Sequence, residues 1–536
     1  MTGEVGTRPP ARAGWGLPLV VLIVGMFMSV LDISIVNVAI PTIQKDFGAT
    51  TDDVQWVATG YSLALGVVVP LTGWLGDRFG LAKVYNVALV GFAAGSALCG
   101  LAWDLTSMVA FRIVQAIPGG ILPVVTLAML YRIVPKEKIG TAMGLYGLGI
   151  VFAPAIGPTL GGYLVEYVDW RLIFFINVPV GILGCVAALL VLPEFPAGGA
   201  GRFDLPGFLA IASGLFALLL ALSEGSSWGW DSYRVLMLFT YSVLALALFV
   251  VIELEVEEPL LDVRVFRYWP FTNSLLLIAV LSVGLFGVLF YVPLMLQQAQ
   301  RLGAFETGLV LFPQALVMGV LMPIAGRLYD RIGPRLPATV GLLIVAIGTY
   351  RLHYLTVDAS REHVMALLAF RAVGMGLAMM PIMTGGLAVI PTELLSRASA
   401  FNNVVQRSVA ALGLAVLTAM LTSQRAQLMA DRSARLRPDQ VMPTTGLSGG
   451  SPMAAQYALY QATSARVFVT AVDNLFLVTA ALTVVGVGLA LLLRSNVFHR
   501  PDTGPETGPE TGTDDTVGTR SGTARPAVAS RLEGAH

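Results

Sequence analysis

Long apolar blocks, separated by short polar stretches, dominate the pattern of this chain. A helix needs about 20 residues to cross the roughly 30 Å of hydrocarbon in a bilayer. Fourteen blocks come close to that length or exceed it. We therefore predict fourteen transmembrane helices, at residues 16–40, 54–75, 84–103, 105–131, 139–164, 171–193, 205–223, 235–254, 271–297, 306–326, 337–356, 363–389, 398–422 and 467–493.

Composition supports an all-α polytopic membrane protein. Of 536 residues, 56% are hydrophobic and 12% are charged, whereas a soluble chain carries about 25% charged residues. The 33 basic and 33 acidic residues cancel, so no net field favours nucleic acid. Cys99 and Cys185 both lie inside apolar blocks, which is typical of small buried hydrophobes. We expect no disulfide, metal site or cofactor.

Basic residues in the short loops predict the orientation, because cytoplasmic loops are enriched in lysine and arginine. With the N-terminus inside, the cytoplasmic loops hold twelve basic residues and the short outer loops hold five. Both termini are therefore expected in the cytoplasm, and the protein in the cell inner (plasma) membrane. The stretch 423–466 is then one long outer loop, whose arginines do not count because long loops cross regardless of charge.

Two short motifs recur and indicate an internal duplication. GWLGDRFG at 73–80 matches GRLYDRIG at 326–333, and AFRIV at 110–114 matches AFRAV at 369–373. The offsets are 253 and 259 residues, as expected of two six-helix halves with a substrate site between them. Eight predicted helices separate the copies, so two are an insertion. The predicted domains are a disordered tail at 1–14, a six-helix bundle at 15–195, the inserted pair at 196–262, a second bundle at 263–495 and a disordered cytoplasmic tail at 496–536.

The motifs resemble those of the major facilitator superfamily, specifically its branch of 14-span drug:proton antiporters. LDISIVNVAIP, GWLGDRFGLAK, RIVQAIPGG, GIVFAPAIGPTLGG and WRLIFFINVPVG carry the resemblance, which covers about residues 16–494. Two departures are Leu81, where a basic residue is usual, and Ala116, where a glycine is usual. The resemblance implies export of drugs in exchange for protons.

Asp32 and Arg112 are the strongest candidates for a proton-coupling site. Asp32 lies eight residues from the predicted outer end of its helix and Arg112 lies seven from its own, which places both about 10–12 Å deep. A carboxylate inside a bilayer is costly and is usually functional. A static ion pair between two helices is the alternative, while the resemblance implies that an acid here recognises cationic drugs.

The repeated GxLxDRxG segments predict a conformational latch at the cytoplasmic face. Anchoring by positive charge explains the arginines but not the aspartates. The latch residues are Gly73, Asp77, Arg78, Gly80, Asp330 and Arg331. The span at 139–164 adds an antiporter motif of Gly149, Pro154, Gly157, Pro158, Gly161 and Gly162, which permits close helix packing and, by resemblance, seals against proton leak.

Substrate contacts are the least specific part of the prediction. Polar groups in apolar spans are Asn37, Tyr61, Gln115, Gln297, Arg371, Asn402 and Asn403. Each is equally compatible with a structural role; Arg371 in particular has no matching acid in the ninth span and fits a carbonyl-bonding arginine equally well. Arg407 and Asp473 are given no role.

The expected function is a proton-coupled exporter of amphiphilic, cationic drugs that works by alternating access. Alternatives on the same scaffold are an exporter of a lipid, siderophore or endogenous antibiotic, and a nutrient symporter. HExxH and P-loop GxxxxGK[ST] motifs do not occur in the sequence, which argues against a zinc protease or an ATPase. Expected partners are a small-molecule substrate, protons and the lipid bilayer, with loop 423–466 available to an envelope partner.

Overall fold

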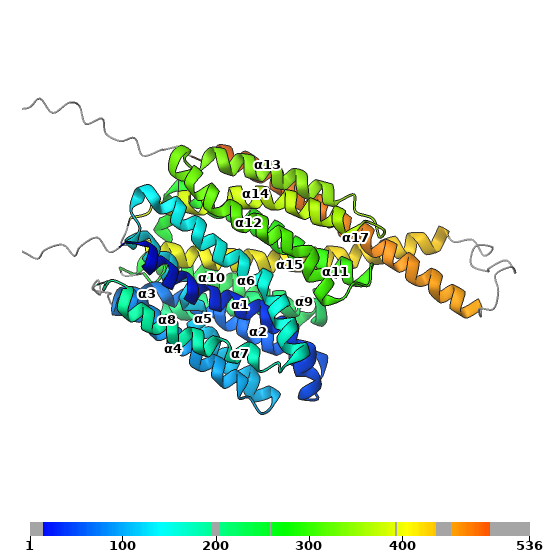
Figure 1. Ribbon diagram of the computed structural model, residues 1–536, viewed down its shortest axis with the longest axis horizontal. Helices are drawn as coiled ribbons and strands as arrows, with labels where there is room; N and C mark the ends of the chain where they lie inside the picture. The colour runs from blue at the N-terminus through cyan, green and yellow to red at the C-terminus, as the bar shows by residue number, and fades with distance from the viewer. Residues whose placement is uncertain (1–13, 196–202, 258, 392–393, 436–451, 494–536) are drawn as a thin grey trace, which may run out of the picture. The chain divides into compact units, whose positions relative to one another are not determined.

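The computed structural model describes residues 14–195, 203–257, 259–391, 394–435 and 452–493, and every regular element in these ranges is a helix (Figure 1). The tails expected to be disordered, 1–14 and 496–536, lie outside the described residues apart from Gly14. The all-α prediction is confirmed.

The helices follow the order that the apolar blocks predict. The first half contains α1 (Gly16–Asp46), α2 (Thr51–Val68), α3 (Leu71–Phe79), α4 (Leu81–Gly100), α5 (Leu105–Ile133), the short η1 (Lys136–Lys138), α6 (Ile139–Tyr167), α7 (Leu172–Phe175) and α8 (Asn177–Val191). Next come α9 (Leu205–Trp228), α10 (Tyr233–Glu255) and the short η2 (Val263–Arg267). The second half contains α11 (Trp269–Gln298), α12 (Ala304–Ile332), α13 (Arg335–Leu352), α14 (Arg361–Leu387), α15 (Leu395–Arg435) and α17 (Pro452–Leu491).

Thirteen helices in the described chain are long and apolar enough to cross a membrane, and there are fourteen spans if the bent pair α2 and α3 is one. The sequence predicts a continuous helix at 54–75, whereas α2 and α3 meet at an angle of 56°. Pro70 explains the bend, because it has no N–H to donate to the preceding turn and its ring clashes there.

The two halves meet mainly along α6 and α12, which pack against each other. Helix α6 also packs on α1, and α15 packs on α5 from the other half. Helices α9 and α10 pack on each other, with α9 also contacting α2 and α15. Side chains such as Leu183 and Leu190 of α8 are 69% and 81% exposed, as expected of a surface that faces lipid.

Helices α15 and α17 run well into the stretch expected to be the outer loop 423–466. The described part of this stretch is helical, since α15 continues to Arg435 and α17 begins at Pro452, while 436–451 lie outside the described residues. Figure 1 shows these ends beside each other beyond the neighbouring helices. Asn474 donates to Gln424 (3.0 Å) and Arg425 to Ser464 (3.2 Å), so polar side chains link α15 to α17.

Candidate functional site

Asp32 and Arg112 form an ion pair inside the first half. Arg112 Nη1 lies 2.5 Å from Asp32 Oδ2, and the two side chains are 0% and 1% exposed. Asp32 Oδ1 accepts from Gln115 Nε2 at 3.1 Å and from Asn177 Nδ2 at 3.4 Å. Removing one partner of such a pair leaves a buried charge and costs about 3–5 kcal/mol.

Arg112 has other contacts besides Asp32. Its Nη1 donates to Gln115 Oε1 (2.8 Å) and its Nε to the Val57 carbonyl (3.3 Å). Its guanidinium lies 3.8 Å from the centre of the Tyr61 ring, a favourable cation–π geometry. The arginine is therefore held by neutral groups that do not depend on the charge of Asp32.

Four elements assemble this cluster: α1 supplies Asp32, α5 supplies Arg112 and Gln115, α2 supplies Tyr61, and α8 supplies Asn177. Sequence reasoning missed Asn177, although it lies within the quoted segment WRLIFFINVPVG. Asn177 also donates to Ser96 Oγ (3.0 Å), which fixes its amide. An asparagine inside an apolar span was the available signal, but Asn37 gives the same signal and is exposed.

Asp330 of α12 crosses to the first half and caps the start of α6. Its carboxylate accepts from the Gly140 N–H (2.8 Å), the Thr141 N–H (3.0 Å) and the Thr141 hydroxyl (2.8 Å). The first N–H groups of a helix have no partner within the helix, and a negative charge is favoured there. Asp330 therefore holds the two halves together at this end.

Asp77 of α3 makes the corresponding contact in the opposite direction. Its Oδ2 lies 4.0 Å from Arg397 Nε, in the first turn of α15, and the two side chains are 18% and 24% exposed. Gly73 lies against Arg397, since a Cβ there would be 3.4 Å from Arg397 Cγ. The repeated aspartates therefore each reach a helix start in the other half, but Asp77 makes the looser contact.

The glycines that end the two repeats share an unusual backbone. Gly80 and Gly333 have φ values of +84° and +78° and stand at the C-terminal ends of α3 and α12. A left-handed backbone favours glycine here. Arg78 and Arg331 are exposed, so the structure gives them no contact across the latch.

The antiporter motif lies on α6, which continues through Pro154 and Pro158. Gly157 and Gly161 pack directly on α1: a Cβ at Gly157 would lie 2.8 Å from Ser34 Cβ, and one at Gly161 would lie 2.8 Å from Ile35 Cγ1. Gly149 faces Ile23 and Met26, both at 3.0 Å, whereas Gly162 faces open space. This stripe brings α6 against the residues that follow Asp32.

A second stripe of α6 glycines faces the other half, and sequence reasoning did not select it. Gly140 and Gly144 lie against α12, and Gly147 lies against Met322 and Met380. Small residues allow such close approach between helices in a membrane. Helix α6 thus contacts α1 on one face and the second half on the other.

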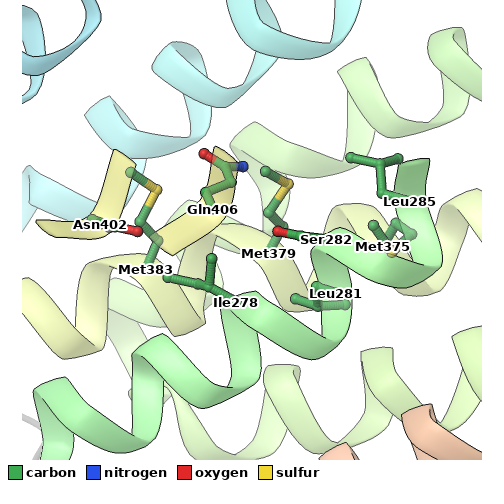
Figure 2. A pocket seen from close by; sticks show the side chains of 9 residues that line it. All are labelled: Ile278, Leu281, Ser282, Leu285, Met375, Met379, Met383, Asn402 and Gln406. Carbon is green, nitrogen blue, oxygen red and sulfur yellow. The ribbon is translucent and has the colours of Figure 1, made fainter. Parts of the chain in front are cut away.

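A narrow slot lies within the second half, between α11, α14 and α15. Its lining residues are Ile278, Leu281, Ser282, Leu285, Met375, Met379, Met383, Asn402 and Gln406. Figure 2 shows the α14 methionines and the α15 amides meeting there from different helices. Its free volume is about 10 Å³, enough for about one water molecule. Methionine side chains are flexible, so a ligand would have to displace them.

The remaining substrate candidates are scattered. Asn402 lines the slot, and Tyr61 and Gln115 belong to the Asp32 cluster. Asn403 donates to the Ser399 carbonyl of its own helix (3.0 Å). Asn37 and Gln297 are exposed and belong to neither site. Arg371 is fully buried in the second half.

Comparisons with known proteins bear on the family and on the fold. A family model described as the Major Facilitator Superfamily matches residues 22–414. The "Tetracenomycin C resistance and export protein" of Streptomyces glaucescens is 34% identical over 81% of each chain. A "Multidrug resistance protein B homolog" of Mycobacterium tuberculosis is 33% identical over 75% of this chain and 76% of its own. The solved structure of the proton:xylose symporter XylE covers 90% of this chain and 99% of its own at a TM-score of 0.54 and 14% identity, which supports the fold alone.

Proposed function

The chain belongs to the Major Facilitator Superfamily and is a membrane transporter rather than an enzyme, and we propose that it exports amphiphilic drugs in exchange for protons by alternating access. Relatives at 33–34% identity are named for drug resistance and export. We further propose that it lies in the inner membrane with both ends in the cytoplasm, which the basic residues of the short loops support.

The observation that carries this proposal is the set of neutral contacts around Arg112. When Asp32 takes up a proton, the ion pair is lost. Arg112 still bonds Gln115 and the Val57 carbonyl and still faces the Tyr61 ring. These contacts lower the cost of separating the charges, whereas a purely static pair needs no such set. Asp32 is therefore the residue that we assign to proton exchange.

The test is substrate-driven proton release from proteoliposomes that contain the Asp32→Asn variant. We expect proton release to be lost because an amide does not titrate, although it nearly matches the carboxylate in shape. Asp46→Asn is the matched control, since Asp46 is an exposed aspartate near the end of the same helix. Full proton release by the Asp32→Asn protein would rule out this assignment.

One comparison favours a more specific function, namely export of an antibiotic that the cell itself synthesises. The 34% identical relative is named for both resistance to and export of tetracenomycin C. Growth inhibition by an antibiotic panel, with and without expression of this chain in a sensitive host, tests it. Protection confined to one antibiotic class supports this candidate, whereas broad protection supports a multidrug exporter.

A further inference from the structure

Arg371 is a buried cation that no described carboxylate neutralises. Its side chain is 0% exposed, and it takes part in none of the four ion pairs among the described residues. Its Nε donates to Thr349 Oγ1 (3.0 Å) and its Nη2 to the Gly284 carbonyl (2.7 Å), but Nη1 has no partner. These neutral acceptors satisfy two donors and leave the charge uncompensated.

Such an arrangement is costly, because a buried ion pays several kcal/mol of desolvation, which hydrogen bonds to neutral acceptors offset only in part. No described carboxylate lies within ion-pair distance of Arg371; the half-buried Asp473 of α17 has an oxygen without a hydrogen-bond partner, and the three buried carboxylates have other contacts. Asp32 pairs with Arg112, Asp204 accepts from the Gly207 N–H, and Glu253 accepts from the Leu261 N–H. The position repeated from Arg112 therefore has the arginine without its acid.

Two observations relate Arg371 to the slot, whose lining residues are drawn in Figure 2. Arg371 precedes Met375, Met379 and Met383 at intervals of four residues on α14, and residues at that spacing share a helix face. The three methionines line the slot. Gly284, whose carbonyl Arg371 bonds, lies in sequence between the lining residues Ser282 and Leu285. Arg371 is therefore at one end of the slot.

A second arginine lies beside the slot lining in the sequence. Arg407 follows the lining residue Gln406 on α15 and is also absent from the four ion pairs. It lies within electrostatic reach of the Tyr61 and Tyr146 hydroxyls of the first half. None of the nine residues that line the slot is acidic.

We propose that the slot opens to bind an amphiphile that carries an anionic oxygen, a carboxylate or phenolate, which accepts a hydrogen bond from Arg371 Nη1. The methionines pack against its apolar part, and Ser282, Asn402 and Gln406 supply neutral polar contacts. This inference rests on the proposed export function and names its substrate class. It replaces the expectation of cationic drugs, for which the slot has no carboxylate.

The test compares two dyes that share a xanthene ring and a methyl ester but differ in charge. Fluorescein methyl ester is a phenolate anion, whereas rhodamine 123 is a cation. Binding of each to the full-length protein in nanodiscs is measured by fluorescence polarisation. We expect the wild type to bind the anion at least tenfold more tightly, and Arg371→Gln to lose at least tenfold in affinity for the anion alone, since a hydrogen bond to a charged group is worth about that factor.

Two further variants separate the charge from the fold. Arg371→Lys keeps the charge and should keep the preference for the anion. Arg351→Gln removes an exposed arginine at the end of α13 and should change neither affinity. The affinities of the wild-type protein for the two dyes test the proposal even if Arg371→Gln does not fold. Equal affinities, tighter binding of rhodamine 123, or undetectable binding of fluorescein methyl ester would overturn the proposal.

Binding is measured without a proton gradient, so it reports on the slot and not on proton exchange. A protein that prefers the anion but releases no protons during transport would retain this inference and lose the proposed antiport. A protein that exchanges protons for rhodamine 123 alone would lose this inference and retain the antiport.

Discussion

The two repeated aspartates should contribute unequally to the latch, and Asp330→Asn tests this most directly. The asparagine keeps one carbonyl oxygen for α6, but its amide nitrogen cannot accept from Thr141, and the charge at the helix start is lost. A hydrogen bond to a charged group contributes about 1.5–3 kcal/mol, and the charge at a helix terminus about 0.3–1 kcal/mol. Since one acceptor remains, we expect a loss of about 1.5–2 kcal/mol.

Asp77→Asn should have a smaller effect. Asp77 lies 4.0 Å from Arg397 and both side chains are partly exposed, and exposed ion pairs contribute about 0.2–1 kcal/mol. The ratio of the two conformations should therefore change by roughly 10–30-fold for Asp330→Asn and by at most about fivefold for Asp77→Asn.

The assay is the distribution of distances between two spin labels, measured by double electron–electron resonance. Glu137→Cys and Arg335→Cys place exposed labels on the two halves near Asp330, in a background without the two native cysteines, Cys99 and Cys185. Each latch variant should raise the population with the larger distance. Equal shifts for the two variants, or a larger shift for Asp77→Asn, would refute the reasoning from the contacts.

Three further predictions follow from the packing. Gly157→Leu should lower the free energy of unfolding by about 1–3 kcal/mol, because α1 fills the space beside Gly157. Gly162 faces open space, so Gly162→Leu should change it by no more than about 0.5 kcal/mol. Equal losses in thermal unfolding would contradict the packing of α6 on α1. Tyr61→Leu should cost about 2 kcal/mol more than Tyr61→Phe, since only phenylalanine keeps a ring over Arg112, and equal melting temperatures would count against this contact. Asp77→Asn should slow transport in vesicles while leaving substrate binding in nanodiscs intact, and a parallel loss of binding would show that Asp77 has a different role.

The sequence predicted the helices and the chemistry of single side chains better than it predicted which side chains contact each other. Equal depth along two apolar blocks indicated that Asp32 and Arg112 could meet, because helix rise converts position into distance. The GxLxDRxG repeat indicated matching aspartates, but their unequal contacts depend on what the opposite helix presents: Thr141 and free N–H groups in one case, Arg397 in the other. No periodicity within the repeat carries that information.

The errors have a common physical origin. The stretch 423–466 was expected to be one outer loop, yet its described part is helical, and Arg425 of α15 donates there to Ser464 of α17. Hydropathy locates apolar segments and gives no signal for a helix that continues past them. Asn177 was missed for a related reason, because only its neighbours distinguish it from the exposed Asn37.

The two sites lie in different halves, and this limits how exchange can operate. A proton on Asp32 and an anion at Arg371 have opposite charges, so they do not repel, and direct electrostatic competition cannot make their binding exclusive. We infer that a change in helix packing must separate them. Helix α6 is suitably placed: Gly157 and Gly161 touch α1 at Ser34 and Ile35, just after Asp32, while Gly147 touches Met380 of α14, beside the slot residue Met379. Asp330 caps the start of this helix. A shift of α6 that follows protonation of Asp32 would therefore change the contacts of both the slot and the latch.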